Sequence, residues 1–266
     1  MNNTPRKKVV IGSRESNLAM IQSRHIQSLL SASHPDIEFI IETSSSHGDD
    51  NQNVPLSVVG ASNPGLFTKS LEVHITTGRY DLAVHSLKDM PTTLPDGLTL
   101  SAITTREDPT DALVLHPQYN LASSTIKTLA DLPKGAIIGT SSLRRQALIH
   151  RYHPHLTVVS IRGNLNTRLA KLDQSTILLE RKNVDGETKK NTTTTATTAS
   201  TTASTQCSTE EWIGEPNVHY DAIVLATAGL IRMGWKDRIS EILHLFQYGI
   251  SQGALGKYSK RRCEQM

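Results

Sequence analysis

The sequence predicts an α/β protein built from two lobes with a ligand-binding cleft between them. Short β-branched runs alternate with segments of helical periodicity, a pattern typical of a parallel sheet with crossover helices. The pattern occurs twice along the chain, and the stretch 107–111 (Glu-Asp-Pro-Thr-Asp) indicates a crossing from one lobe to the other. Two α/β lobes joined in this way generally bind a ligand at the carboxyl ends of their strands.

In the first half of the chain, residues 8–12 form a run typical of a buried strand. Residues 17–30 place apolar side chains at helical spacing, from Leu18 to Leu29, and therefore predict a helix. The same patterns predict a helix at 66–76 and strands at 37–43, 81–85 and 112–115.

The second half repeats this plan. It predicts strands at 136–139, 156–161 and 221–225, and helices at 142–152, 164–172 and 226–233. The pattern stops between residues 182 and 216, and residues 188–209 are almost all Thr, Ala and Ser. Such a composition cannot bury enough apolar surface to offset its ordering entropy, so we expect a disordered, Thr-rich insertion at about 183–216.

Charge and cysteine content narrow the classes of function. A formal net charge of +3 is too small to indicate a nucleic-acid binder. It fits either arginines gathered around an acidic small molecule or a scattered solvated surface. No run approaches the ~18 apolar residues that span a membrane, and two cysteines, Cys207 and Cys263, make neither a disulfide framework nor a cysteine-rich metal site. We therefore expect a cytoplasmic protein without bound metal, nucleic acid or membrane.

Arginine follows three of the predicted strands, each time beside small hydroxyl or glycine residues at the start of a helix. Backbone N–H groups and the helix dipole favour anions at such helix starts, and the planar guanidinium suits carboxylates. Ser and Thr at these positions are also ordinary N-caps, and phosphate stays open as the anion, although no P-loop or G-x-G-x-x-G is present. The residues concerned are Arg14, Ser16, Ser142, Arg144, Arg145, Arg162 and Arg168.

The strand predicted at 81–85 ends differently, because it runs into Lys88 and Asp89. The surrounding arginines favour the ionised form of a carboxylate at this position. Asp89 could therefore stabilise a developing cation or move a proton; the alternative is an ordinary Asp–Lys turn pair. His85 fits a packed strand-end residue better than a catalytic base.

Eight motifs, in order along the chain, resemble those of the hydroxymethylbilane synthase (porphobilinogen deaminase) family. The three most specific are Val-His-Ser-Leu-Lys-Asp-Met-Pro (84–91), Gly-Thr-Ser-Ser-Leu-Arg-Arg-Gln (139–146) and Ile-Arg-Gly-Asn (161–164) with Thr-Arg-Leu (167–169). The others are Gly-Ser-Arg-Glu-Ser (12–16), Gly-Leu-Phe-Thr-Lys (65–69), Arg-Glu-Asp-Pro (106–109), Ala-Thr-Ala-Gly-Leu (226–230) and Gln-Gly-Ala-Leu-Gly (252–256).

The resemblance implies two lobes similar to periplasmic binding proteins, a third small α+β domain, and a dipyrromethane cofactor attached to a cysteine of that domain. It implies a monomeric transferase that condenses four porphobilinogen molecules into hydroxymethylbilane, with Asp89 as the catalytic carboxylate. Cofactor and substrate carboxylates would be held by Arg14, Ser16, Lys88, Ser142, Arg144, Arg145, Arg162 and Arg168, and Lys69 and Gln252 would line the same cleft.

The resemblance also implies domain limits: residues 1–106 with about 250–266 form the first lobe, and 107–249 the second. After Gly256 the sequence departs from the family motif, so we expect an incomplete return strand and no third domain. Neither Cys207 nor Cys263 has the family's glycine-glycine-cysteine setting, so we assign no cofactor anchor. Ser62-Asn-Pro64 and Ser70 also depart from the family pattern. Two alternatives stay open: a non-catalytic two-lobed anion-binding protein, and an effector-binding domain of a transcription regulator, for which no helix-turn-helix is present.

Overall fold

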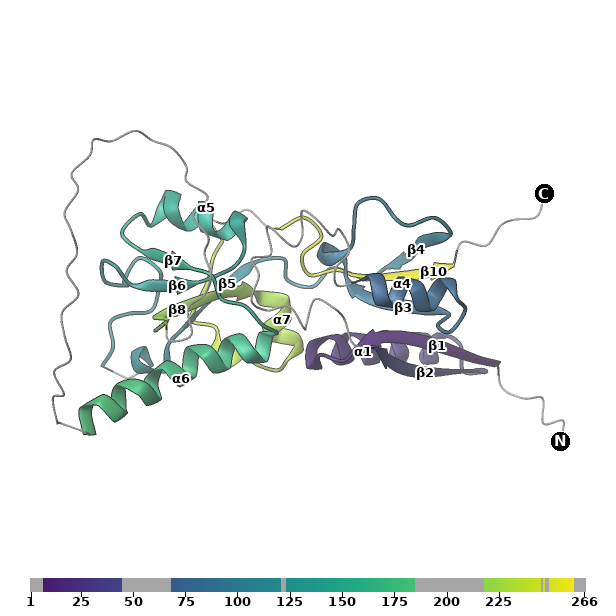
Figure 1. Ribbon diagram of the computed structural model, residues 1–266, viewed down its shortest axis with the longest axis horizontal. Helices are drawn as coiled ribbons and strands as arrows, with labels where there is room; N and C mark the ends of the chain where they lie inside the picture. Colours follow the sequence, from purple (N-terminus) through teal and green to yellow (C-terminus); the bar gives the residue numbers. More distant parts are fainter. Residues whose placement is uncertain are drawn as a thin grey trace, which may run out of the picture.

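The computed structural model describes residues 7–44, 68–120, 123–184, 218–244, 246 and 249–260. Two lobes lie side by side along the long axis of the molecule, and the chain passes between them twice (Figure 1). Each lobe contains a five-stranded sheet, in the order β2-β1-β3-β10-β4 in the first and β7-β6-β8-β5-β9 in the second. The predicted α/β class and two-lobed organisation are thus present.

The strands of the first sheet are β1 (Lys7–Arg14), β2 (Ile37–Ser44), β3 (Leu82–Ser86), β4 (Leu98–Ile103) and β10 (Leu255–Lys260). Those of the second are β5 (Asp111–Leu115), β6 (Ile137–Gly139), β7 (Thr157–Val159), β8 (Ala222–Ala226) and β9 (Glu241–Ile242).

Both sheets are mixed: the predicted parallel pairing is present between β1, β2 and β3 and between β6, β7 and β8, and antiparallel pairs are added to it. Strand β10 is antiparallel to β3 and β4, and β5 is antiparallel to β8. The reason is that β5 and β10 each follow a crossing segment, so they enter their sheet from the cleft end, whereas β1, β3, β6 and β8 leave it there. Hydrogen bonds join the two crossing segments, from the Glu107 N–H to the Gly253 carbonyl (3.1 Å) and from the Thr104 N–H to the Leu255 carbonyl (3.0 Å).

Helices α1 (Asn17–Ser33) and α4 (Lys69–Thr76) belong to the first lobe, and α5 (Leu143–Tyr152), α6 (Leu165–Val184) and α7 (Thr227–Arg232) to the second. The 3-10 turns are η1 (Leu87–Asp89), η2 (Pro117–Tyr119) and η3 (Lys236–Arg238). Helix α6 is longer than predicted, because it continues past Leu172 to Val184. Residues 66–67 of the predicted 66–76 helix, and residues 185–217 with most of the predicted insertion, lie outside the described residues.

Both faces of the second sheet are covered. Along β5, Leu113 and Leu115 pack into one apolar cluster, while Ala112 and Val114 pack into another on the opposite face. This explains why β5 is a continuous apolar run, since a strand covered on both faces has no polar side to show. The cores thereby fix the strand ends that face the first lobe.

A Tyr-Asp pair repeats before β3 and β8 and fixes the neighbouring strand in each lobe. The Asp81 carboxylate accepts the Val10 N–H of β1 at 2.7 Å, and the Asp221 carboxylate accepts the Ile137 N–H of β6 at 2.8 Å. A carboxylate that accepts a backbone N–H forms a charge-assisted bond. The sequence analysis did not identify this repeat, which holds β1 and β6 in equivalent places in the two lobes.

The tyrosines of these two Tyr-Asp pairs explain why residues 12 and 139 are glycines. A Cβ on Gly12 would lie 2.3 Å from the Tyr80 ring, and one on Gly139 would lie 2.9 Å from the Tyr220 ring. Each glycine therefore lets a tyrosine pack directly on the strand backbone. Arg14 ends β1 two residues after Gly12, and the loop that leads to Arg144 and Arg145 starts after Gly139.

The return strand β10 runs to Lys260, beyond the Gly256 where the family motif ends. It pairs with β3 from Leu255 to Ser259 and with β4 from Gly256 to Lys260. Tyr258 is fully buried and packs in the apolar cluster of the first lobe. The expected return strand is therefore present as six paired residues and is not cut short at Gly256.

Candidate functional site

The cleft between the lobes contains two adjoining hollows, with volumes of about 270 Å³ and about 90 Å³. Here the ends of β1 and β3 face α6, α7 and the second crossing segment. Eight of the predicted site residues line these hollows: Arg14, Ser16, Lys88, Asp89, Arg145, Arg162, Arg168 and Gln252. Side chains that lie far apart in the sequence thus meet in one cleft, as their positions at strand ends predicted.

Three predicted residues do not line the hollows. Lys69 begins α4 and is exposed away from them. Ser142 is the N-cap of α5, where its Oγ accepts the Arg145 N–H at 3.5 Å. The Arg144 guanidinium is turned toward Asp111. For Ser142, capping of the helix is thus the role that the structure describes.

Ser16 is both a helix cap and a cleft residue, the two roles expected of a hydroxyl at a helix start. Its Oγ accepts the Ala19 N–H at 3.4 Å and caps α1, and the same residue lines the smaller hollow beside Arg14. The first turn of α1 is thereby directed at the cleft.

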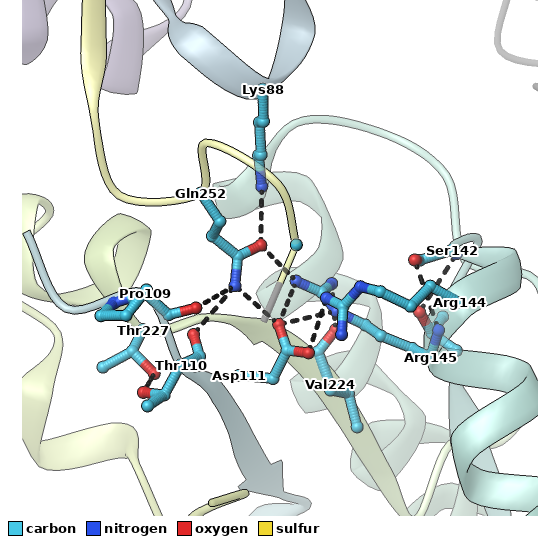
Figure 2. Close-up of polar contacts among 12 residues, drawn as sticks. Lys88, Pro109, Thr110, Asp111, Ser142, Arg144, Arg145, Val224, Thr227 and Gln252 are labelled. Carbon is cyan, nitrogen blue, oxygen red and sulfur yellow. Dashed lines mark hydrogen bonds and ion pairs between the residues drawn. The ribbon is translucent and has the colours of Figure 1, made fainter. Parts of the chain in front are cut away.

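A carboxylate that the sequence analysis missed, Asp111, organises the floor of the cleft. Its side chain is fully buried at the start of β5 (Figure 2). Arg145 donates to it through Nε (3.0 Å) and Nη2 (2.7 Å), and Arg144 through Nη2 (2.7 Å). Burial alone would raise the pKa of Asp111, but the charge and hydrogen bonds of Arg145, then Gln252 and Arg144, hold that pKa below its usual value.

Gln252 joins this ion pair to both crossing segments and to the first lobe. Its Nε2 donates to the Pro109 and Thr110 carbonyls (2.8 and 3.0 Å) and to Asp111 (2.9 Å). Its Oε1 accepts from Lys88 Nζ at 3.3 Å and from Arg145 Nη2 at 3.4 Å (Figure 2). A single buried amide thus links Lys88 of one lobe to the arginines of the other.

Positive charge exceeds negative charge at the cleft surface. Six basic side chains line the larger hollow, and Asp89 is the one acidic side chain among its described lining residues. Burial, together with the charges of Arg145 and Arg162, lowers the pKa of Arg168 to about 10, and Asp89 opposes this shift. Such crowding favours a ligand that carries several acid groups.

Lys88 and Asp89 lie together at the mouth of the hollows, at the end of η1. Desolvation within the cleft lowers the pKa of Lys88; Asp89 opposes this shift, whereas Arg145 and Arg168 add to it. Both side chains are open to the cleft. Asp89 therefore presents its carboxylate to both hollows, beside the cationic Lys88.

His85 is buried behind this pair and packs edge-on against Tyr258, with ring centroids 5.7 Å apart. Burial, together with the charge of Arg14, lowers the pKa of His85 to about 3, so the imidazole is neutral near pH 7. Its Nε2 has no hydrogen-bond partner among the described residues. The packed position agrees with the expectation that His85 is a strand-end residue.

Arg232 is a further cleft residue that the sequence analysis missed. It ends α7, lines the larger hollow, and donates from Nη2 to the Gly253 carbonyl at 2.6 Å. A strand end followed by an arginine-bearing helix is the signal that predicted the other cleft arginines. It applies here too, because β8 ends at the cleft and leads into α7, which ends in Arg232.

In the part of the chain that the structure describes, no helix is long and apolar enough to cross a membrane. The same residues contain no group of three or more His, Cys, Asp or Glu side chains arranged to hold a metal ion.

Fold and cleft together define a two-lobed α/β protein with a basic cleft, whose larger hollow has six cationic side chains and one carboxylate among its described lining residues. The family model "Porphobilinogen deaminase, dipyromethane cofactor binding domain" matches residues 9–187 and 209–266. This chain belongs to the porphobilinogen deaminase family. The match omits 188–208, within the predicted Thr-rich insertion, and extends past Gly256, where we expected the resemblance to end.

The curated relatives include the porphobilinogen deaminases of Gloeobacter violaceus and Nostoc sp.. That of Gloeobacter violaceus is 43% identical over 253 residues, which are 94% of this chain and 62% of the relative. That of Nostoc sp. is 42% identical over 253 residues, covering 94% of this chain and 63% of the relative. The chain thus spans less than two thirds of the length of these relatives.

Solved structures give fainter likenesses. The periplasmic aliphatic sulphonate binding protein SsuA from Escherichia coli matches 97% of this chain and 62% of its own, with 12% identity and a TM-score of 0.38. The periplasmic VFT2 domain of BvgS from Bordetella pertussis matches 96% of this chain and 80% of its own, with 13% identity and a TM-score of 0.42. The fold assignment rests on the sheet topology described above.

Proposed function

We propose that this chain forms the substrate cleft of a transferase that condenses four porphobilinogen molecules head to tail into hydroxymethylbilane and releases ammonia, a step of tetrapyrrole (haem) biosynthesis. The observation that carries the proposal is the position of Asp89 among six basic side chains in the cleft. Porphobilinogen has an acetate and a propionate, so each added unit brings two carboxylates. A site for such a chain needs many cations, and its reacting centre needs a negative charge.

The residues present fit the family's dipyrromethane cofactor, which is itself made of pyrroles with acid side chains. When bound, it supplies the covalent end to which pyrrole units are added. Arg14, Arg162 and Arg168 would hold its carboxylates by charge-assisted bonds. Cys207 and Cys263 lie outside the described residues, and neither is proposed as its anchor.

The chain's own groups then divide the work. The basic side chains bind the acid groups and orient the substrate. Asp89 stabilises the positively charged pyrrole that forms as ammonia leaves, and keeps this stabilisation until the new carbon–carbon bond is made. Lys88 lies beside it and contributes to substrate carboxylate binding. We further propose that the protein acts as a cytoplasmic monomer, without metal, membrane or nucleic acid.

The test is to incubate the 266-residue chain with porphobilinogen, measure binding by calorimetry, and record the intact mass. We expect binding and consumption of porphobilinogen, and any mass increment of pyrrole units would show that this chain contains an anchoring residue. An absence of binding would refute the proposal. Binding with neither a covalent increment nor substrate consumption would instead support a non-catalytic anion-binding protein. Asp89→Asn separates these alternatives, because the transferase loses turnover while porphobilinogen stays bound, whereas a pure anion binder has no turnover to lose and only gains affinity.

A further inference from the structure

Asp111 is a charged residue whose carboxylate never reaches the cleft. Its side chain is fully buried, and both oxygens are engaged by Arg144, Arg145 and Gln252 at 2.7–3.0 Å. It is absent from the described lining of both hollows, whereas Arg145 and Gln252 line the larger one. Asp111 therefore acts on any ligand through the residues that it holds.

The contacts of Arg145 show how Asp111 restrains the Arg145 guanidinium. Nε and Nη2 of its guanidinium donate to Asp111 Oδ1, and Nη1 donates to the Val224 carbonyl at 3.0 Å. These bonds fix the plane of the guanidinium, and Nη2 also donates to Gln252 Oε1 at 3.4 Å. Of its five N–H groups, the contacts with the described residues leave one on Nη1 for a ligand in the larger hollow. A donor that is held in place beforehand gains affinity for a carboxylate, because binding then costs less conformational entropy.

The negative charge of Asp111 has a second effect. Arg144, Arg145 and Lys88 converge around Asp111 and Gln252 (Figure 2). One buried carboxylate offsets part of this positive charge, so a small anion of the wrong shape gains less by binding here. Affinity then depends on how well the acid groups of the ligand match the guanidinium plane.

We propose that Asp111 is a positioning residue, which orients Arg145 toward a carboxylate of the ligand and restrains non-specific anion binding. The identity of the ligand rests on the proposed function, so porphobilinogen is the specific probe. Inorganic phosphate is the non-specific probe, because it responds to charge without presenting a matched carboxylate.

The deciding variant is Asp111→Asn, which keeps the shape and removes the charge. We expect the Kd for porphobilinogen to rise about tenfold, since the guanidinium is no longer held by an ion pair. We expect the Kd for phosphate to fall several-fold, since the cleft gains net positive charge. A purely structural role would weaken binding of both probes together, so the opposite signs identify positioning.

Asp173→Asn is the matched control. Asp173 forms a bidentate pair with Arg238 at 2.7 and 3.0 Å, away from the cleft lining, and its loss changes net charge by the same amount. Both affinities should stay at the wild-type value in this variant. Asp111→Glu restores the charge with a longer side chain, so phosphate affinity should return to the wild-type value and porphobilinogen affinity should recover in part.

All titrations use the full 266-residue chain in calorimetry, with a melting curve for each variant. Equal responses of Asp111→Asn and Asp173→Asn would overturn the proposal, as would parallel weakening of both probes. If Asp111→Asn does not fold, Asp111→Glu decides, and wild-type porphobilinogen affinity in that variant would overturn the proposal. Failure of the wild type to bind porphobilinogen would refute the proposed function instead, and the phosphate titrations still test the effect of the Asp111 charge.

Discussion

Substitution of Gly253 by alanine tests how closely the two crossing segments pack. Gly253 has a φ of +92°, and a Cβ there would lie 2.3 Å from the Glu107 carbonyl oxygen. The backbone conformation alone costs a non-glycine residue about 1–2 kcal/mol. Relief of the clash must also disturb the bonds that the Gly253 carbonyl accepts from the Glu107 N–H and from Arg232.

Each of those two hydrogen bonds contributes about 1 kcal/mol. We therefore expect Gly253→Ala to lower the free energy of unfolding, measured by urea denaturation, by about 3–4 kcal/mol. Gly97→Ala is the control, because Gly97 has a φ of +80° and no atom within 4 Å of the added Cβ. It should lose about 1–2 kcal/mol, from the backbone conformation alone. Equal losses in the two variants would refute the argument that the crossing segments pack tightly.

Two further predictions concern buried polar groups. The pKa of His85 is lowered to about 3 in the folded protein. As pH falls below about 6.5, the His85 imidazole therefore takes up a proton only in the unfolded chain. The free energy of unfolding should decrease from there toward pH 3, by up to about 4–5 kcal/mol. His85→Phe should flatten this part of the stability–pH curve, and an unchanged slope in urea titrations would contradict the assignment. Asp221→Asn should lower the free energy of unfolding by about 1–2 kcal/mol, because Asp221 accepts the Tyr119 hydroxyl at 2.7 Å and a backbone N–H of β6. The exposed Asp237→Asn should change it little, and a similar loss in both would contradict this role.

Much of the cleft could be predicted because parallel strands end at the same edge of a sheet. That rule places Arg162 and Arg168 at the cleft edge of the second sheet and Arg14 at that of the first, and the two edges face each other across the cleft. It failed for Ser142, where a capping hydroxyl and a cleft hydroxyl have the same sequence signature. It would have found Arg232 had it been applied to the end of β8 as well.

The partners of these residues could not be predicted from the sequence. Asp111 meets Arg145 across 34 positions and Gln252 across 141, and no local periodicity reports such contacts. Mixed pairing was missed for a related reason, since the direction of β5 and β10 depends on where the chain crosses between lobes. Periodicity also ended the helix predicted at 164–172 too early, because α6 continues to Val184, two residues into the predicted insertion.

The central claim is that Asp89 acts chemically in a cleft that binds porphobilinogen. Ammonia release from porphobilinogen tests it most directly, measured for the wild-type chain, Asp89→Asn and the control Asp173→Asn under the same conditions. We predict release by the wild type and the control, and a rate lowered by about 10²–10⁴ in Asp89→Asn with porphobilinogen still bound. Equal rates in the wild type and Asp89→Asn, or no release by the wild type, would contradict the claim.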